Sequence, residues 1–171
     1  AKEIGREDVI AELQQRAEKY AIKLKRMYSE KDGIFLNYDI AKKQPSWRLS
    51  PTLFYPLIGK VATDEMLSGM LKKHFYNEKE FYGEYMMASA PWNDPNYEND
   101  YWKGRIWAPM NYLVYLGLSN YTKSDAVKAR KELASKSKKL LMKEWLNNGF
   151  VFENYNSKTG EGYDVHSADP F

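Results

Sequence analysis

The sequence predicts an all-α fold in which an inner layer of helices is wrapped by an outer layer, as in an α/α toroid. The distribution of apolar residues along the chain favours this fold class. Long amphipathic segments alternate along the chain with shorter segments that are apolar on nearly all sides. A helix that is apolar all round must be buried between other helices, so the alternation describes two layers. At 171 residues the chain fits a single domain.

The first amphipathic segment covers residues 6–30. Its apolar positions recur every three or four residues, as on one face of a helix: Val9, Leu13, Ala17, Tyr20, Leu24 and Met27. Asp32 and Gly33 then predict a turn. Residues 34–40 are expected to be extended or loop-like.

The next two segments predict an inner helix and then an outer helix. Ser50 and Pro51 have the character of an N-cap and a first helical residue, and Pro56 should shorten or kink the apolar helix over 52–61. Thr63 predicts the N-cap of an amphipathic helix that ends near residue 75. One side of this helix is apolar and carries a histidine, which we expect in the core with its hydrogen bonds satisfied: Met66, Leu67, Met70, Leu71 and His74.

Residues 77–99 are irregular and rich in Tyr, Pro, Asn and Gly, and they predict a long loop. Its aromatic residues argue against disorder, and loops of this length in compact domains often have a function. Residues 105–118 predict a second apolar helix, with Pro109 tolerable only in its first turn and Asn111 as the polar exception.

Residues 123–147 predict a long amphipathic helix that Asn148 and Gly149 end. Basic residues cover most of its surface, and we interpret that face as a solvated outer surface in preference to a nucleic-acid patch. Its apolar stripe is Ala126, Leu133, Leu140, Leu141 and Trp145. The remainder of the chain is expected to be loop.

The predicted helices do not close a ring. The apolar helices over 52–61 and 105–118 would expose large apolar faces unless more helix pairs packed against them. We therefore expect the chain to be a fragment of a larger domain, with the missing helices as its partner.

Composition excludes several classes of function. The 26 Lys and Arg against 23 Asp and Glu give a net charge of only +3, which argues against nucleic acid as the main partner. The absence of Cys excludes a disulfide framework and a thiolate zinc site. The two histidines, His74 and His166, are isolated from each other in the sequence, so no metal or cofactor is expected. No targeting segment or membrane-spanning run is visible, and the compartment stays open.

The stretch 100–118 is the densest in groups that hold a sugar. Aromatic rings offer flat apolar faces to the C–H side of a pyranose, while a guanidinium and a carboxamide donate directional hydrogen bonds to its hydroxyls. The sequence places five such residues within a few helical turns: Tyr101, Trp102, Arg105, Trp107 and Asn111. Arg105 and Asn111 are expected to hydrogen-bond sugar hydroxyls or to orient Glu153. The structural alternatives are that the aromatic residues, Trp107 above all, are core, and that Arg105 and Asn111 form an internal salt bridge or a helix cap.

Glu153 is the candidate general base. It follows the apolar run 150–152 and precedes Tyr155, and desolvation there would keep a carboxylate basic enough to take a proton from water. The alternative is a Glu that caps a turn or pairs with a lysine. Glu161 is the local competitor, but its glycine neighbours predict a mobile, solvated turn.

Several segments together resemble the catalytic region of glycoside hydrolase family 63, which includes processing α-glucosidase I and mannosylglycerate hydrolase-like enzymes. They cover residues 48–171 and read LSPTLFYPLIGKVA, GEYMMASAPWNDPNY, YWKGRIWAPMNYLVYLGL, LASKSKKLLMKEWLNNGFVFENYNSKTGEGYDV and SADPF. The resemblance implies inverting hydrolysis of an α-glucosidic or α-mannosidic bond in an (α/α)6 barrel. It also implies that residues 1–171 are the C-terminal portion of that single barrel domain.

The family pattern assigns the general base to the Glu of the ENY motif, here Glu153. Its general acid is an Asp in an upstream Trp-Asp motif, and no Trp-Asp pair occurs in this sequence. We therefore expect this chain to hold half of the catalytic pair and to be inactive alone. The resemblance implies a sugar subsite at Tyr101, Trp102 and Trp107.

The loop over 77–99 should border the groove through Trp92 and Glu84, and Tyr155 beside the base is a further candidate for substrate contact. Glu84 is equally a candidate for a structural carboxylate that anchors the loop. The expected ligand is an oligosaccharide or a small α-glycoside. The rival function is a non-catalytic helical module that binds carbohydrate or protein through the same aromatic groove.

Overall fold

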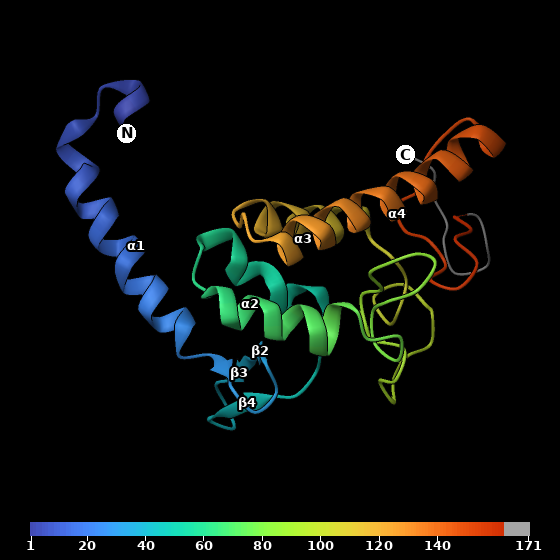
Figure 1. Ribbon diagram of the computed structural model, residues 1–171, viewed down its shortest axis with the longest axis horizontal. Helices are drawn as coiled ribbons and strands as arrows, with labels where there is room; N and C mark the ends of the chain where they lie inside the picture. The colour runs from blue at the N-terminus through green and yellow to red at the C-terminus, as the bar shows by residue number, and fades with distance from the viewer. Residues whose placement is uncertain (163–171) are drawn as a thin grey trace.

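A computed structural model describes residues 1–162 of the chain (Figure 1). Its regular structure is predominantly helical, which confirms the all-α prediction. The helices are α1 (Ile10–Lys25), α2 (Asp64–Met70), α3 (Ala108–Ser119) and α4 (Ser124–Asn148), the 3-10 helices η1 (Lys2–Ile4), η2 (Glu7–Val9) and η3 (Pro51–Gly59), and the π-helical turn η4 (Leu71–Phe75). Among residues 1–162, no helix is both long enough and apolar enough to cross a membrane.

Helix α1 confirms the first predicted helix but projects away from the rest of the molecule (Figure 1). None of its residues is buried. Its apolar positions Leu13 and Tyr20 are therefore exposed, at 48% and 63%.

Two short hairpins follow α1. Strand β1 (Tyr28–Ser29) pairs with β2 (Ile34–Phe35), and β3 (Asn37–Asp39) pairs with β4 (Gln44–Ser46), both antiparallel. The predicted extended region therefore forms parts of both hairpins.

The inner helix η3 begins at Pro51, as predicted, but it is 3-10 instead of α-helical. Pro56 has no N–H to donate, and its ring clashes with the carbonyl four residues earlier in an α-helix. Ser50 is extended before the helix but does not cap it with its side chain; its hydroxyl contacts Thr52 Oγ1 instead.

The predicted outer helix is α2 continued by η4. The Met66 amide donates to Thr63 Oγ1 at 3.2 Å, which confirms the predicted N-cap. His74 is a core histidine, as predicted: its Nδ1 lies 2.7 Å from Glu80 Oε2 and its Nε2 lies 2.8 Å from the Asp32 carbonyl oxygen.

Helices η3 and α3 pack side by side and run in the same direction. Asn120 Nδ2 just after α3 donates to the carbonyls of Leu57 and Ile58 in the last turn of η3, at 3.2 and 2.9 Å. Gly117 permits this approach, because a Cβ there would lie 2.8 Å from Leu57 Cβ. The segments that precede the two helices therefore lie at the same end of the inner layer.

Helix α4 confirms the predicted outer helix and ends at Gly149, which adopts φ 77°. Ala126, Leu133 and Leu140 are buried on its inner side. The prediction that Trp145 belongs to the buried stripe is wrong, because the last turns of α4 extend past the body and leave Trp145 54% exposed (Figure 1).

Candidate active site

Three segments meet at the N-terminal end of α3. The amide of Ile106 donates to the Tyr155 carbonyl at 2.8 Å, and the Tyr155 amide donates to the Ile106 carbonyl at 2.9 Å. On its other side Ile106 pairs with Ala88, and the Ser89 amide donates to the Arg105 carbonyl at 2.8 Å. Main-chain bonds thus bring the segment of Glu153 against the aromatic stretch.

The aromatic stretch is not helical where the sequence suggested. Helix α3 begins at Ala108, and Trp107 is extended at its N-cap, so Tyr101, Trp102 and Arg105 lie in the preceding loop. The backbone at Arg105 and Ile106 is already engaged in pairing with neighbouring segments, so it cannot form helical bonds. A tight turn closed by the Lys103 amide on the Asp100 carbonyl, at 2.6 Å, presents Tyr101 and Trp102.

Three rings form an aromatic cluster with an exposed outer face. Trp102 stacks on Trp107 with the ring centroids 3.6 Å apart and an interplanar angle of 4°. Tyr101 contacts the Trp107 ring edge-on, and its carbonyl accepts from Trp107 Nε1 at 3.1 Å. Trp107 is 5% exposed, while Tyr101 and Trp102 are 48% and 52% exposed. The two exposed rings can contact a ligand, and Trp107 supports them from behind.

Glu153 is half-buried and lies at the end of a polar chain. Asn154 Nδ2 donates to its Oε2 at 3.4 Å, and Asn154 Oδ1 accepts from Arg105 Nε. The Phe152 amide donates to Tyr155 Oη at 2.9 Å, which folds the backbone around Glu153. Burial raises the pKa of Tyr155, so its hydroxyl stays protonated.

Three predicted substrate contacts turn inward. Arg105 and Tyr155 are 0% exposed and Asn111 is 3% exposed. Arg105 also donates to the carbonyls of Glu161 and Gly162, at 3.3 and 3.5 Å. Asn111 donates to the Met86 carbonyl at 2.6 Å and accepts from the Met87 amide at 3.0 Å. This geometry favours positioning roles over sugar contact for all three side chains.

Trp92 lies between two neighbours that fix its ring. Its Nε1 donates to Ser157 Oγ at 3.3 Å, and Lys158 Nζ lies 3.9 Å from the ring centroid. On the other side, a Cβ at Gly83 would lie 2.0 Å from Trp92 Cη2, so only glycine fits there. Trp92 is half-buried and joins the 77–99 loop to the segment of Glu153.

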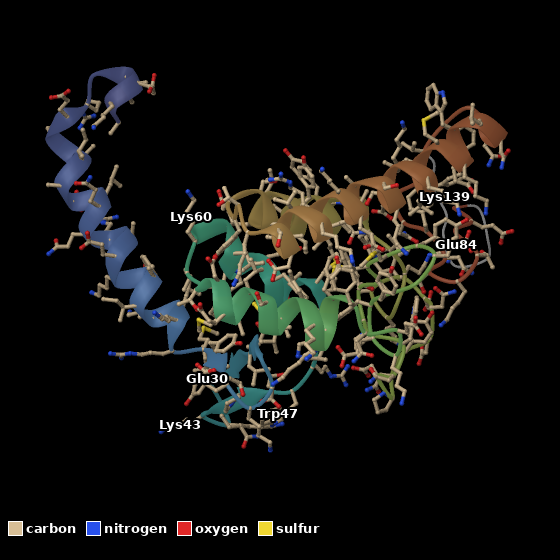
Figure 2. All side chains as sticks on the ribbon, viewed as in Figure 1. Glu30, Lys43, Trp47, Lys60, Glu84 and Lys139 are labelled. Carbon is tan, nitrogen blue, oxygen red and sulfur yellow. The ribbon has the colours of Figure 1, made fainter. Side chains whose placement is uncertain are left out.

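Glu84 lies on the outer surface and pairs with Lys139 of α4 at 2.7 Å (Figure 2). The hydrogen bond and charge of Lys139 lower the pKa of Glu84. Nearby, Lys136 Nζ lies 4.3 Å from the centroid of the Tyr82 ring. Part of the basic face of α4 therefore anchors the aromatic loop, and the anchoring alternative for Glu84 fits this arrangement.

The turn around Glu161 is packed, which contradicts the prediction that it is mobile and solvated. Gly160 and Gly162 are buried, and they pack so closely against Tyr85 and Phe152 that a Cβ atom at either glycine would collide with these rings. The Asn156 amide donates to the Glu161 carbonyl at 2.8 Å. The glycines serve close packing, while the Glu161 side chain itself is exposed.

Sequence reasoning missed Asn154 and Ser157. Ser157 Oγ lies 2.7 Å from Tyr97 Oη, and Asn99 Oδ1 accepts from the Ser157 amide at 3.0 Å. The only local signal was their closeness to Glu153 in the sequence. Their partners come from a distant loop that no local pattern identifies.

Within residues 1–162, no cluster of three His, Asp or Glu side chains could hold a metal ion. Residues 163–171, which include His166 and the SADPF segment, lie outside the described part of the chain.

Residues 1–169 match the family described as the mannosylglycerate hydrolase MGH1-like glycoside hydrolase domain. The chain is 28% identical over 120 residues to a probable mannosyl-oligosaccharide glucosidase of Schizosaccharomyces pombe, which covers 65% of this chain and 15% of that protein. It is 28% identical over 151 residues to a cytosolic neutral trehalase of Beauveria bassiana, which covers 85% of this chain and 19% of that protein. It thus spans less than a fifth of each of these relatives.

Two solved structures have a similar fold. A family 63 mannosylglycerate hydrolase from Thermus thermophilus, in complex with glucose, matches with a TM-score of 0.71 at 22% identity, over 84% of this chain and 34% of that one. The neutral trehalase from Saccharomyces cerevisiae matches with a TM-score of 0.67 at 22% identity, over 86% of this chain and 27% of that one. These similarities confirm the predicted partial (α/α)6 barrel.

Proposed function

The chain belongs to the mannosylglycerate hydrolase MGH1-like domain family, within glycoside hydrolase family 63, and on that premise we propose that it supplies the general base and part of the sugar site of an inverting hydrolase. The bond cleaved is an α-glucosidic or α-mannosidic bond. One observation carries this proposal: the half-buried carboxylate of Glu153 lies in a segment paired through the main chain with the loop that presents Tyr101 and Trp102.

Inversion requires two carboxyl groups, roughly 6.5 to 9.5 Å apart, on opposite sides of the scissile bond. Glu153 takes a proton from a water molecule while the water oxygen bonds to the anomeric carbon. The bond from that carbon to the leaving oxygen breaks, and the leaving oxygen receives a proton from the acid. In this proposal the acid comes from an upstream part of the barrel that this chain does not contain, and residues 1–171 form the C-terminal portion of the domain.

The other side chains bind or position. Tyr101 and Trp102 offer their exposed faces to the sugar, with Trp107 behind them. Arg105 and Asn154 orient the Glu153 carboxylate through their hydrogen bonds. Trp92 forms a wall of the groove. The substrate is an oligosaccharide or a small α-glycoside, and the partner is the rest of the barrel.

The test replaces Glu153 with Gln in the full-length protein. Turnover should fall by roughly 10²- to 10⁴-fold, because the amide cannot accept the proton, while substrate affinity changes little. Glu161→Gln is the matched control, since that carboxylate lies in the same segment but faces solvent. Activity is measured by release of the free sugar, and NMR of the first product formed gives its anomeric configuration.

Near-normal turnover by Glu153→Gln would contradict the assignment of Glu153 as the general base. A product with retained configuration would contradict the inverting mechanism. Saturable sugar binding without any hydrolysis by the full-length protein would favour the non-catalytic carbohydrate-binding module instead.

A further inference from the structure

The β3–β4 hairpin carries an aromatic hollow that the proposed function does not use. Tyr38 and Trp47 are 53% and 62% exposed. Both line a hollow of about 600 Å³ between the hairpin and the segment that follows α1. Figure 2 shows Trp47 and Lys43 on this hairpin, away from Glu84 and Lys139.

The strand register explains why these rings share one face. Tyr38 pairs with Pro45 across the hairpin, and Trp47 lies two residues beyond Pro45. Because side chains alternate between the faces of a strand, Tyr38, Pro45 and Trp47 point to the same side. The floor is closed by Leu36, whose amide donates to the Met27 carbonyl at 2.9 Å.

Polar groups complete the hollow. The Arg26 guanidinium and the Asn37 carboxamide line it beside the rings. In the part of the chain that the structure describes, neither side chain has a hydrogen-bonding partner. Flat apolar faces combined with directional donors are the features that recognise a pyranose ring, and this volume suits one or two sugar units.

The hollow lies at the same end of the inner layer as the candidate active site. Helices η3 and α3 run in the same direction, because Asn120 after α3 bonds to the last turn of η3. The hairpin precedes η3, and the loop with Tyr101 and Trp102 precedes α3. Both features therefore lie at this end of the inner layer.

We propose that the hairpin hollow is an outer sugar subsite, which binds a pyranose unit of an oligosaccharide beyond the bond that is cleaved. This inference rests on the proposed function and extends it to longer substrates. Trp47 stacks on the sugar ring, Tyr38 contacts its edge, and Arg26 and Asn37 donate hydrogen bonds to its hydroxyls.

The test measures sugar affinity by calorimetry in the full-length protein with Glu153→Gln, so that no probe is consumed. The probes are maltotetraose and an α-1,2-linked mannotetraose, each compared with its disaccharide. Trp47→Ala should weaken the affinity for whichever tetrasaccharide binds by about tenfold, the size of a lost aromatic contact. The affinity for the corresponding disaccharide should not change. Trp145→Ala on α4, a similarly exposed tryptophan, is the matched control.

Tyr38→Ala is a second variant with the same expected direction, and circular dichroism checks that each variant is folded. The subsite is overturned if neither tetrasaccharide binds, if Trp47→Ala and Tyr38→Ala leave affinity within twofold, or if Trp145→Ala weakens it equally. A change in oligomeric state without a change in sugar affinity also overturns it, in favour of an interface between copies. If Glu153 is not the base, the Glu153→Gln protein turns substrate over at a near-normal rate, whatever the affinity measurements give. The two proposals can therefore fail separately.

Discussion

Arg105 is a guanidinium without solvent contact, and its described acceptors all lie in the segment that contains Glu153. A buried cation costs several kcal/mol unless hydrogen bonds compensate it. Here the compensation comes from Asn154 Oδ1 and from two carbonyls of the turn at residues 161–162. Arg105 therefore fixes both the neighbour of Glu153, the proposed base, and the turn that follows it.

Arg105→Lys is expected to lower kcat on the order of a hundredfold, because an ammonium cannot reach acceptors spread around a planar guanidinium. KM should change much less, since the side chain is buried and donates to acceptors of the protein itself. Steady-state kinetics of the full-length protein measure both constants, with Arg130→Lys on α4 as the matched control. A rise of about a hundredfold in KM with an unchanged kcat would show that Arg105 binds substrate directly.

His74 shows how one residue makes stability depend on pH. Both ring nitrogens face acceptors, the Glu80 carboxylate and the Asp32 carbonyl, so the imidazolium is the form that satisfies both. Burial and Lys73 lower the pKa of His74, but the bonds to Glu80 and Asp32 outweigh them and raise it.

Because the folded-state pKa is raised, the stabilisation by His74 is complete below its unfolded pKa of about 6.5 and is lost as pH rises through the folded value. Urea unfolding at pH 6 and pH 9 tests this. The free energy of unfolding of wild type should exceed that of His74→Gln by more at pH 6 than at pH 9. An equal difference at both pH values would contradict a charged His74.

Among the elements, those set by local sequence were predicted well. Pro51, Pro109 and Gly149 mark helix ends through their own backbone preferences, and Thr63 does so through its side-chain cap; each lies where expected. The pairing of Ile106 with Tyr155 could not be predicted, because it joins segments far apart in the chain. The sequence therefore identified Glu153 and the exposed aromatic pair as candidates. It left open whether Arg105 and Asn111 face a sugar or the interior, and it did not predict that Tyr155 is buried.

Gly117→Ala tests the contact between the inner helices. Its Cβ would lie 2.8 Å from Leu57 Cβ, so η3 and α3 must separate, at a cost of about 1–3 kcal/mol in free energy of unfolding. Gly59→Ala is the matched control, because its nearest contact, at 3.4 Å, is ordinary. Urea denaturation measures both variants, and equal stabilities would show that the inner helices can move apart freely.

At the scale of the whole molecule, apolar surface remains open on both flanks. On one flank, helix α1 has no buried residue. At the other, α3 and α4 enclose an apolar hollow of about 300 Å³ lined by Tyr112, Leu133 and Leu140. Both surfaces fit a chain that spans about a third of the Thermus thermophilus mannosylglycerate hydrolase of similar fold.

Tyr112→Asp in the full-length protein tests whether neighbouring helices cover this hollow. The side chain is 60% exposed in this chain. If another helix packs there, a carboxylate should lower the free energy of unfolding by about 2–3 kcal/mol. Tyr38→Asp on the β3–β4 hairpin, 53% exposed, should cost far less. Similar losses from both substitutions would place Tyr112 at the surface of the complete protein.

The main-chain pairing of Ile106 with Tyr155 holds the segment of Glu153 independently of the turn that carries Tyr101 and Trp102. Main-chain atoms make both bonds, so the pairing itself does not depend on which side chains the two residues carry. Tyr101 and Trp102 belong to a turn outside this pairing. If the proposed roles hold, substitutions in that turn can therefore change the preferred sugar during evolution or engineering while Glu153, the proposed base, keeps its main-chain pairing.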